Sequence, residues 1–314
     1  MPAAPDARPP IAVVDAFTAQ PFAGNPAGVC LLDAAASVAW MQQVAAELRH
    51  SETAFCWPEQ HGWRLRWFTP TTEVTLCGHA TLAAAHLLWE RGLAEPHQPV
   101  VFHTAAGPLV CHREPDHDAP TGAPPRIWLD FPERRARPAP ALEGLLSALG
   151  VPGQVVGRSE EGDWLVEVAD VATVDGLEPD LTALGELAAR AVIVTAAGET
   201  GAGQSTTGGI GHGEAGAGVA DRADAPAADL VSRVFAPAVG VDEDPVTGSA
   251  HATLAPHWAA RLQRTELVAL QRSPRAGTVW CRLAGHRVWL GGHAVTVLTG
   301  VLAARDTGPL GSRA

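Results

Sequence analysis

Residues Val241 to Leu254 read V-D-E-D-P-V-T-G-S-A-H-A-T-L: an acidic run, a proline and a T-G-S turn directly before an alanine-rich helical pattern. A helix that begins near Gly248 turns its unpaired backbone N–H groups toward whatever lies in front of it. Those donors and the helix dipole favour an anion there, and a glycine lets the anion approach the backbone. Asp244 lies a few residues upstream as a fixed carboxylate. An ordinary capped helix with an acidic first turn is the alternative interpretation.

An earlier stretch repeats this pattern. Residues Arg66 to Leu82 read R-W-F-T-P-T-T-E-V-T-L-C-G-H-A-T-L, and Arg233 to Leu254 read R-V-F-A-P-A-V-G-V-D-E-D-P-V-T-G-S-A-H-A-T-L. Both give Arg-x-Phe-x-Pro, then a Glu five residues before a Gly, then a polar residue and an Ala-rich helix. The glutamates are Glu73 and Glu243, and the polar residues are His79 and Ser249. Such a repeat predicts two similar domains whose helix N-termini converge on one cleft, a common place for ligands.

The composition limits the class of protein. With 314 residues and 46% hydrophobic residues, the chain is long enough for two domains of ordinary size. Its net charge of −12 argues against nucleic acid as a partner. No apolar run reaches transmembrane length and the N-terminus has no signal-peptide core, so we expect no membrane partner and a cytoplasmic location. The five cysteines form no CxxC pair, so neither a disulfide framework nor a metal site is expected.

The order of expected elements divides the chain. We expect residues 1–131 to form the first domain and residues 132–292 the second, with a final strand at about 293–304 that can return to the first domain. Residues 196–229 are mostly Gly, Ala, Ser, Thr and Asp, without an aromatic residue. They cannot bury enough apolar area to offset their ordering entropy, which predicts a long flexible insertion in the second domain.

A helix is expected after each glycine of the repeat. The segment from Cys77 to Arg91 is apolar almost all round, which is typical of a helix buried on every side. A domain that wraps strands around one central helix explains such a pattern. The second helix, residues 249–262, contains Pro256, which predicts a kink or a break near that residue.

Four pieces of the sequence together resemble the PhzF-like family, which is named for an isomerase of phenazine biosynthesis. They are V-D-A-F-T-A-Q-P-F-A-G-N-P-A-G-V, S-E-T-A-F, F-T-P-T-T-E-V-T-L-C-G-H-A-T-L-A-A-A and F-A-P-A-V-G-V-D-E-D-P-V-T-G-S-A-H. A more distant similarity extends to diaminopimelate epimerases and proline racemases. The resemblance implies an α+β fold of two similar domains, each a β-roll wrapped around a central helix and related by a pseudo-two-fold axis. It also implies a homodimer.

The resemblance further implies an isomerase without a cofactor that moves a proton within a small conjugated carboxylate. Glu52, in S-E-T-A-F, occupies the family's general acid/base position. His79 and Asp244 match residues of the family's site and are expected to act with Glu52. A Glu in a closed, partly apolar cleft has a raised pKa, which suits this role, and a charged Asp244 nearby would raise it further.

Four residues are expected to bind the substrate. The backbone N–H groups near Gly78 and Gly248 would hold a substrate carboxylate, in agreement with the helix-terminus argument, and Ser249 matches a residue that lines the family's site. Asn25, in G-N-P, either contacts the substrate or only satisfies turn geometry.

Other functions stay open. A non-catalytic protein that binds a small carboxylate is one alternative, and an epimerase of an unknown metabolite is another. Racemisation by two thiols is disfavoured, because the first repeat has Cys77 where the second has Thr247, and a hydroxyl is a far weaker acid than a thiol. Cys77 is then expected to be a small buried residue. Arg275 either meets a substrate anion or lies on the surface, so substrate and pathway are left undecided.

Overall fold

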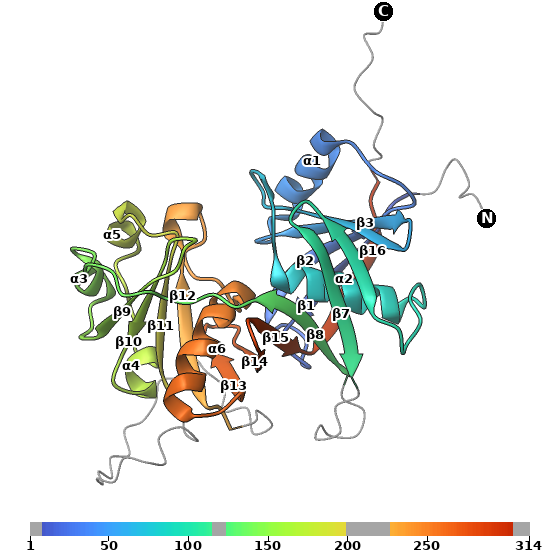
Figure 1. Ribbon diagram of the computed structural model, residues 1–314. Coiled ribbons are helices and arrows are strands. Elements are labelled where there is room, and N and C mark those ends of the chain that lie inside the picture. Colours follow the sequence, from blue (N-terminus) through green and yellow to red (C-terminus); the bar gives the residue numbers. More distant parts are fainter. Residues whose placement is uncertain (1–7, 115–123, 199–226, 304–314) are drawn as a thin grey trace, which may run out of the picture. The chain divides into compact units, whose positions relative to one another are not determined.

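The computed structural model describes residues 8–114, 124–198 and 227–303, which belong to two compact units (Figure 1). Unit 1 comprises Met1–Asp130 and Gly291–Ala314, and unit 2 comprises Phe131–Leu290. Most of the insertion expected at residues 196–229 lies outside the described residues, and its first residues belong to a strand. In the part of the chain that the structure describes, no helix is long and apolar enough to cross a membrane.

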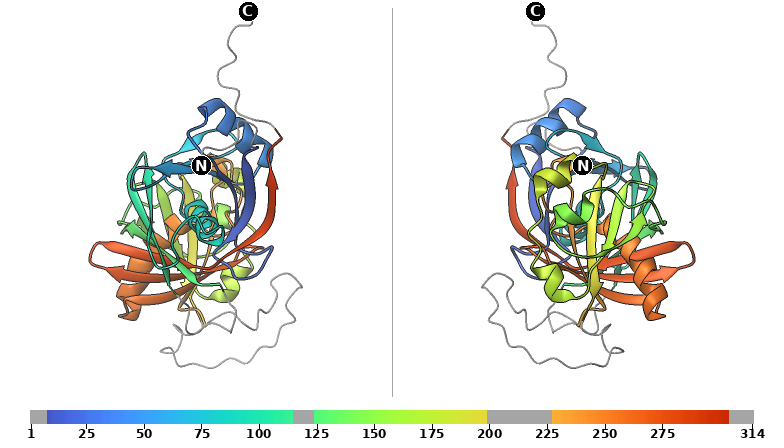
Figure 2. Two further views of the ribbon diagram at one scale, coloured as in Figure 1. Left: turned by 90° about the vertical axis from the view of Figure 1, so that its right-hand side faces the viewer. Right: turned by 90° about the vertical axis from the view of Figure 1, so that its left-hand side faces the viewer.

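Unit 1 is a sheet wrapped around the helix α2 (Gly78–Glu90). Its strands follow one another in the order β16-β1-β2-β3-β4-β6-β7-β8, and the short β5 pairs with β4. The strands are β1 (Pro10–Ala16), β2 (Asn25–Leu31), β3 (Thr53–Glu59), β4 (Gly62–Phe68), β5 (Glu73–Val74), β6 (Val100–Thr104), β7 (Gly107–Glu114), β8 (Arg126–Pro132) and β16 (Ala294–Val301). The last of these, β16, pairs antiparallel with β1, and Figure 2 shows the red strand beside the blue one. Segments from both ends of the described chain therefore share one sheet.

The helix α2 is buried on nearly every side, as the sequence predicts. Ten of its 13 residues are buried, and it contacts β1, β2, β3 and β16. Alanines at positions 83, 84 and 85 have no exposed surface, which lets the strands come close to the helix axis. The helix ends before Gly92, which takes a left-handed φ of 65° as a stop signal should. A second helix of unit 1, α1 (Val38–Leu48), packs on β3 and β4.

Unit 2 repeats this plan around the helix α6 (Gly248–Leu262), ten of whose 15 residues are buried. Its strands follow one another in the order β15-β14-β13-β12-β11-β10-β9. They are β9 (Gln154–Arg158), β10 (Asp163–Glu167), β11 (Ala191–Ala197), β12 (Leu230–Phe235), β13 (Glu266–Gln271), β14 (Gly277–Ala284) and β15 (Arg287–Gly292). The short helices are α3 (Leu145–Leu149), α4 (Val171–Asp175), α5 (Leu181–Glu186) and the 3-10 helix η1 (Pro237–Val239). The chain thus has an α+β fold of two similar domains, each a β-roll around a central helix.

The sequence predicts a kink or a break near Pro256, and the break does not occur, because α6 continues through this residue. A proline has no N–H to donate to the carbonyl four residues earlier, here that of Ala252. That carbonyl instead accepts a hydrogen bond from the backbone N–H of Arg134, with an N–O distance of 3.1 Å. Since the freed acceptor has a partner from another segment of unit 2, part of the usual cost of a proline inside a helix is avoided.

Candidate active site

The repeated motifs make the same contacts in both units. Arg66 donates two hydrogen bonds to the carboxylate of Glu73, each 2.6 Å long. Arg233 donates two to the carboxylate of Glu243, each 2.8 Å long. Each guanidinium also lies over the ring of the phenylalanine two residues later, 5.3 Å from its centroid in unit 1 and 5.1 Å in unit 2. These bidentate pairs tie the end of a strand to the loop before the central helix, which explains the shared Arg-x-Phe and Glu spacing.

The two central helices also begin in the same way. Cys77 caps α2 and Thr247 caps α6, and neither side chain bonds to the helix N–H groups. Four residues later, the hydroxyl of Thr81 donates to the carbonyl of Cys77 over 2.5 Å. At the matching position of α6, Nδ1 of His251 lies 2.8 Å from the carbonyl of Thr247. In both units, backbone N–H groups at the helix start are therefore left to other acceptors, as an anion site requires.

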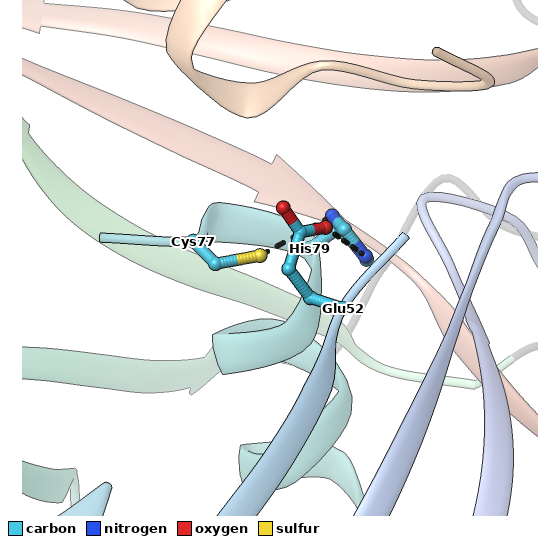
Figure 3. A group of neighbouring side chains, drawn as sticks. All are labelled: Glu52, Cys77 and His79. Carbon is cyan, nitrogen blue, oxygen red and sulfur yellow. Dashed lines mark hydrogen bonds and ion pairs between the residues drawn. The ribbon is translucent and has the colours of Figure 1, made fainter. Parts of the chain in front are cut away.

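Three side chains gather at the start of α2 (Figure 3). Glu52 lies directly before β3. Nε2 of His79 is 3.5 Å from a carboxylate oxygen of Glu52 and 3.4 Å from the hydroxyl of Ser51. Nδ1 of His79 is 3.5 Å from the sulfur of Cys77. Figure 3 shows the carboxylate, the imidazole and the thiol turned toward one another. Their donor atoms lie within 4.8 Å, near enough to share one metal ion.

The surroundings of Glu52 differ from those of a solvated loop carboxylate. Only 21% of its side-chain surface is exposed. Burial raises the pKa of Glu52, while hydrogen bonds from the side chains of Ser51 and Cys77 partly offset this effect. Desolvation disfavours the charged form, so this carboxyl group holds a proton more readily than an ordinary Glu. A raised pKa is what proton transfer near neutral pH requires of a carboxyl group.

Cys77 is buried, as the sequence predicts, and it also contacts both candidate catalytic side chains. Only 7% of its surface is exposed. Its thiol is a hydrogen-bond partner of Glu52 and lies beside His79. Cys77 is therefore part of the candidate site as well as of the core. The sequence places Cys77 and His79 two residues apart around a helix start, but it does not show that Glu52 lies beside them.

In unit 2, the loop before α6 is held by a residue that the sequence did not reveal. Gln271, the last residue of β13, is fully buried. Its Oε1 accepts the backbone N–H of Thr247 at 2.8 Å, and its Nε2 donates to the carbonyl of Asp244 at 2.6 Å and to the hydroxyl of Thr247 at 3.2 Å. That hydroxyl donates to the carboxylate of Asp244 over 2.5 Å. Gln271 therefore fixes both ends of the short loop that carries Asp244.

The remaining predicted residues occupy the following positions. Gly78 and Gly248 are the first residues of α2 and α6, and Ser249 follows in the first turn of α6, half-buried. Asn25 begins β2 and is fully buried. The glycine before it has a φ of 63° and no room for a side chain, since a Cβ would lie 2.2 Å from a backbone oxygen. Backbone geometry thus explains the glycine of the G-N-P turn, and a contact of Asn25 with the substrate stays a prediction. Arg275 is half-buried.

Glu52, His79, Gly78 and Asn25 belong to unit 1, whereas Asp244, Gly248 and Ser249 belong to unit 2. Within unit 1 the structure brings Glu52 and His79 together at the start of α2, and within unit 2 Asp244 bonds to Thr247, the residue that caps α6. The convergence of the two helix starts on one cleft stays a prediction.

Comparison with known proteins places this geometry in a family. The family model of the phenazine biosynthesis-like proteins (PhzC-PhzF) matches residues 14–208 and 212–300. The chain belongs to this family. The match includes both copies of the Arg-x-Phe-x-Pro motif and all seven predicted site residues.

Known members of the family match this chain over nearly their whole length. An uncharacterized isomerase of Halalkalibacterium halodurans is 41% identical over 290 residues, which cover 92% of this chain and 96% of that protein. A PhzF-family protein of Enterococcus faecalis has a crystal structure that superposes with a TM-score of 0.78 at 34% identity, covering 95% of this chain and 100% of that one. A probable proline racemase of Agrobacterium radiobacter, covering 96% of this chain and 94% of that one, reaches a TM-score of 0.55 at 14% identity, which shows a shared fold. This PhzF-type protein is accordingly an enzyme of the isomerase class.

Proposed function

We propose that this isomerase moves a proton between two carbons of a small conjugated carboxylate, with Glu52 as general acid/base and without a cofactor. The observation that carries the proposal is the little-exposed carboxyl group of Glu52, with its raised pKa, 3.5 Å from His79 at the start of a buried helix. Positioned acid/base groups with a pKa near the working pH accelerate proton transfer by about 10²–10⁴-fold.

In this mechanism the carboxylate of Glu52 takes a proton from an activated carbon of the substrate. The electron pair of the broken C–H bond moves into the conjugated system and toward the substrate carboxylate. Glu52, now protonated, returns the proton to another carbon, so that a double bond shifts and no atom is gained or lost. His79 is close enough to Glu52 to stabilise the negative charge that develops.

The substrate carboxylate is assigned to the backbone N–H groups at the two helix starts. Gly78 and Gly248 begin the two helices and place no side chain over these groups, and Ser249 adds a hydroxyl in the first turn of α6. Asn25 is kept as a further substrate contact. Asp244, held by Thr247 and Gln271, is assigned a catalytic role opposite Glu52. This part of the proposal requires both units to face one substrate.

The contact between Glu52 and Cys77 bears on the epimerase alternative. These two groups are hydrogen-bonded neighbours, so they cannot act as the two bases on opposite faces of one reacting carbon. An epimerase would need Asp244 as its second base, whereas return of the proton to a different carbon on the same face needs Glu52 alone.

Hydrogen exchange in heavy water tests the proposal. A panel of small β,γ-unsaturated carboxylic acids is incubated with protein in D₂O, and NMR follows deuterium incorporation and the shift of the double bond. We expect Glu52→Gln to lower the rate by about 10²–10⁴-fold. Glu59→Gln is the matched control, because Glu59 ends the same strand, is exposed and pairs with Arg64 at 3.0 Å. Equal rates for wild type and Glu52→Gln would refute the assignment. Tight binding of an acid without exchange would favour the non-catalytic alternative.

From the family resemblance alone, we also propose that the enzyme acts as a homodimer, and the cytoplasm stays its expected location. Sedimentation velocity of the full chain measures the first point, and a single monomer boundary at micromolar concentration would contradict it.

A further inference from the structure

The three side chains at the start of α2 include three kinds of metal ligand. Glu52 offers a carboxylate, Cys77 a sulfur and His79 an imidazole nitrogen, with donor atoms within 4.8 Å of one another. Sulfur and imidazole ligands select transition metals such as zinc, whereas magnesium and calcium prefer oxygen alone. This combination therefore points to a soft or borderline divalent ion.

The spacing of these atoms suits a tetrahedral ion. Zinc bonds of about 2.0–2.1 Å to nitrogen and oxygen and about 2.3 Å to sulfur place neighbouring ligand atoms roughly 3.3–3.6 Å apart. His79 already lies 3.5 Å from the sulfur of Cys77 and 3.5 Å from the carboxylate of Glu52, through its two ring nitrogens. Ligation by one of these nitrogens requires the third side chain to move by on the order of 1 Å.

The ligands are also fixed and reachable. Cys77 caps α2 and His79 lies in its first turn, so the helix start sets their separation. Cys77 and His79 are buried, and the hydroxyl of Ser51, 3.4 Å from Nε2, can orient the ring as the outer partners of metal-binding histidines do. Glu52 keeps 21% of its side-chain surface exposed, so solvent reaches one of the three ligands. In the occupied site, water would take the fourth position. Three protein ligands and one open position are typical of accessible zinc sites.

We propose that Glu52, Cys77 and His79 form a zinc-binding site, and that zinc bound there inhibits the enzyme reversibly. On binding, the thiol loses its proton to solvent, as does the carboxyl group where it is protonated, and no electron is transferred. Binding therefore weakens as the pH falls. The binding claim does not depend on the proposed function. Only the inhibition does, because zinc would occupy the Glu52 oxygen that accepts the substrate proton.

Metal titration of the chelator-treated full chain tests the site without any activity assay. We expect one equivalent of Co²⁺ to bind with a sulfur-to-cobalt charge-transfer band, and Zn²⁺ to displace it while Mg²⁺ does not. Loss of an outer-sphere partner already costs about 10–100-fold in metal affinity, so Cys77→Ala and His79→Gln should weaken zinc binding by at least about 100-fold. Cys56→Ala is the matched control: Cys56 is a buried thiol of β3 in the same unit, and this variant should bind as wild type does.

Several results would overturn the site. They are the absence of stoichiometric binding, a charge-transfer band that persists in Cys77→Ala, and equal losses in Cys77→Ala and Cys56→Ala. Protection of Cys77 from alkylation by Zn²⁺ in the wild-type chain, followed by mass spectrometry, needs no variant and keeps the test valid if a variant fails to fold. If the wild-type chain binds zinc and the Glu52→Gln variant still isomerises the substrate, the zinc site stands and the proposed function is refuted. Isomerase activity untouched by saturating Zn²⁺ would preserve the function and refute the inhibition.

Discussion

Replacing Glu243 with glutamine should destabilise unit 2 far more than replacing Glu73 destabilises unit 1, although the two residues hold equivalent places in the repeat. The difference lies in burial. Arg233 and Glu243 have 12% and 17% of their side-chain surfaces exposed, against 26% and 36% for Arg66 and Glu73. Glutamine keeps the shape of the side chain but removes the charge and turns an N–H donor toward the guanidinium.

The loss of unfolding free energy in each variant depends on the burial of the ion pair and on the hydrogen bonds that its arginine retains. Removing one partner of a buried ion pair costs roughly 3–5 kcal/mol. Arg233 still donates to the carbonyl of Leu177 at 2.8 Å, so we expect the lower end, about 3 kcal/mol. The pair of Glu73 is partly solvated, and such pairs contribute roughly 0.2–1 kcal/mol. For domains of this size, the losses correspond to Tm shifts of about 6–12 °C for Glu243→Gln and at most about 4 °C for Glu73→Gln.

Differential scanning calorimetry of the wild type and the two variants measures these shifts. The two units need not unfold in one step, so the heat-capacity trace is resolved into its transitions before the comparison. Urea unfolding followed by circular dichroism gives an independent free energy. A Tm loss below about 2 °C for Glu243→Gln, or equal losses in the two variants, would show that burial does not set the strength of these pairs.

Three further outcomes can be checked on the same material. Gln271→Leu removes three buried hydrogen bonds to the Asp244 loop, so the unfolding free energy should fall by roughly 2–4 kcal/mol and kcat should fall as well. Unchanged melting and turnover would count against the positioning role. Burial lowers the pKa of His251 to about 4, so the free energy of unfolding should fall as the pH drops from about 6.5 to about 4. Urea titrations of His251→Gln should show a dependence on pH that is smaller by one proton, and identical slopes in the two proteins would contradict this. Burial raises the pKa of Glu52, so its charged carboxylate lowers the stability of the protein at neutral pH. Glu52→Gln should therefore raise Tm at neutral pH, and this gain should vanish as the pH drops to the ordinary Glu pKa of 4.5. A Tm difference that stays constant across this range would refute the interpretation of Glu52 as a buried acid.

The sequence predicted best what depends on local pattern. The all-round apolar character of residues 77–91 predicted the buried helix, and the glycine of each repeat predicted where a central helix begins. The repeat predicted two similar units, and its Arg and Glu positions proved to be ion pairs. In each case neighbouring residues determine the structure, so their spacing carries the information.

The sequence failed where distant residues meet. Gln271 holds the Asp244 loop from 27 residues away, in a strand that follows a helix closely and reads as a short apolar run. The unbroken α6 depends on an N–H donated by Arg134, which no pattern around Pro256 can reveal. The gathering of Glu52 with Cys77 requires β3 to lie beside α2, a property of packing rather than of ligand spacing.

The hydrogen bond from Arg134 to Ala252 joins two peptide groups, so substitutions at either residue other than proline leave it available. The identity of residue 256 governs it instead, because any other amino acid there brings a rival donor for the same oxygen. The segment that opens unit 2 thus keeps its hydrogen bond to the central helix because residue 256 is a proline. Substitutions of the side chains at positions 134 and 252 leave this hydrogen bond in place, whereas a substitution at position 256, which takes no part in the bond, would weaken it.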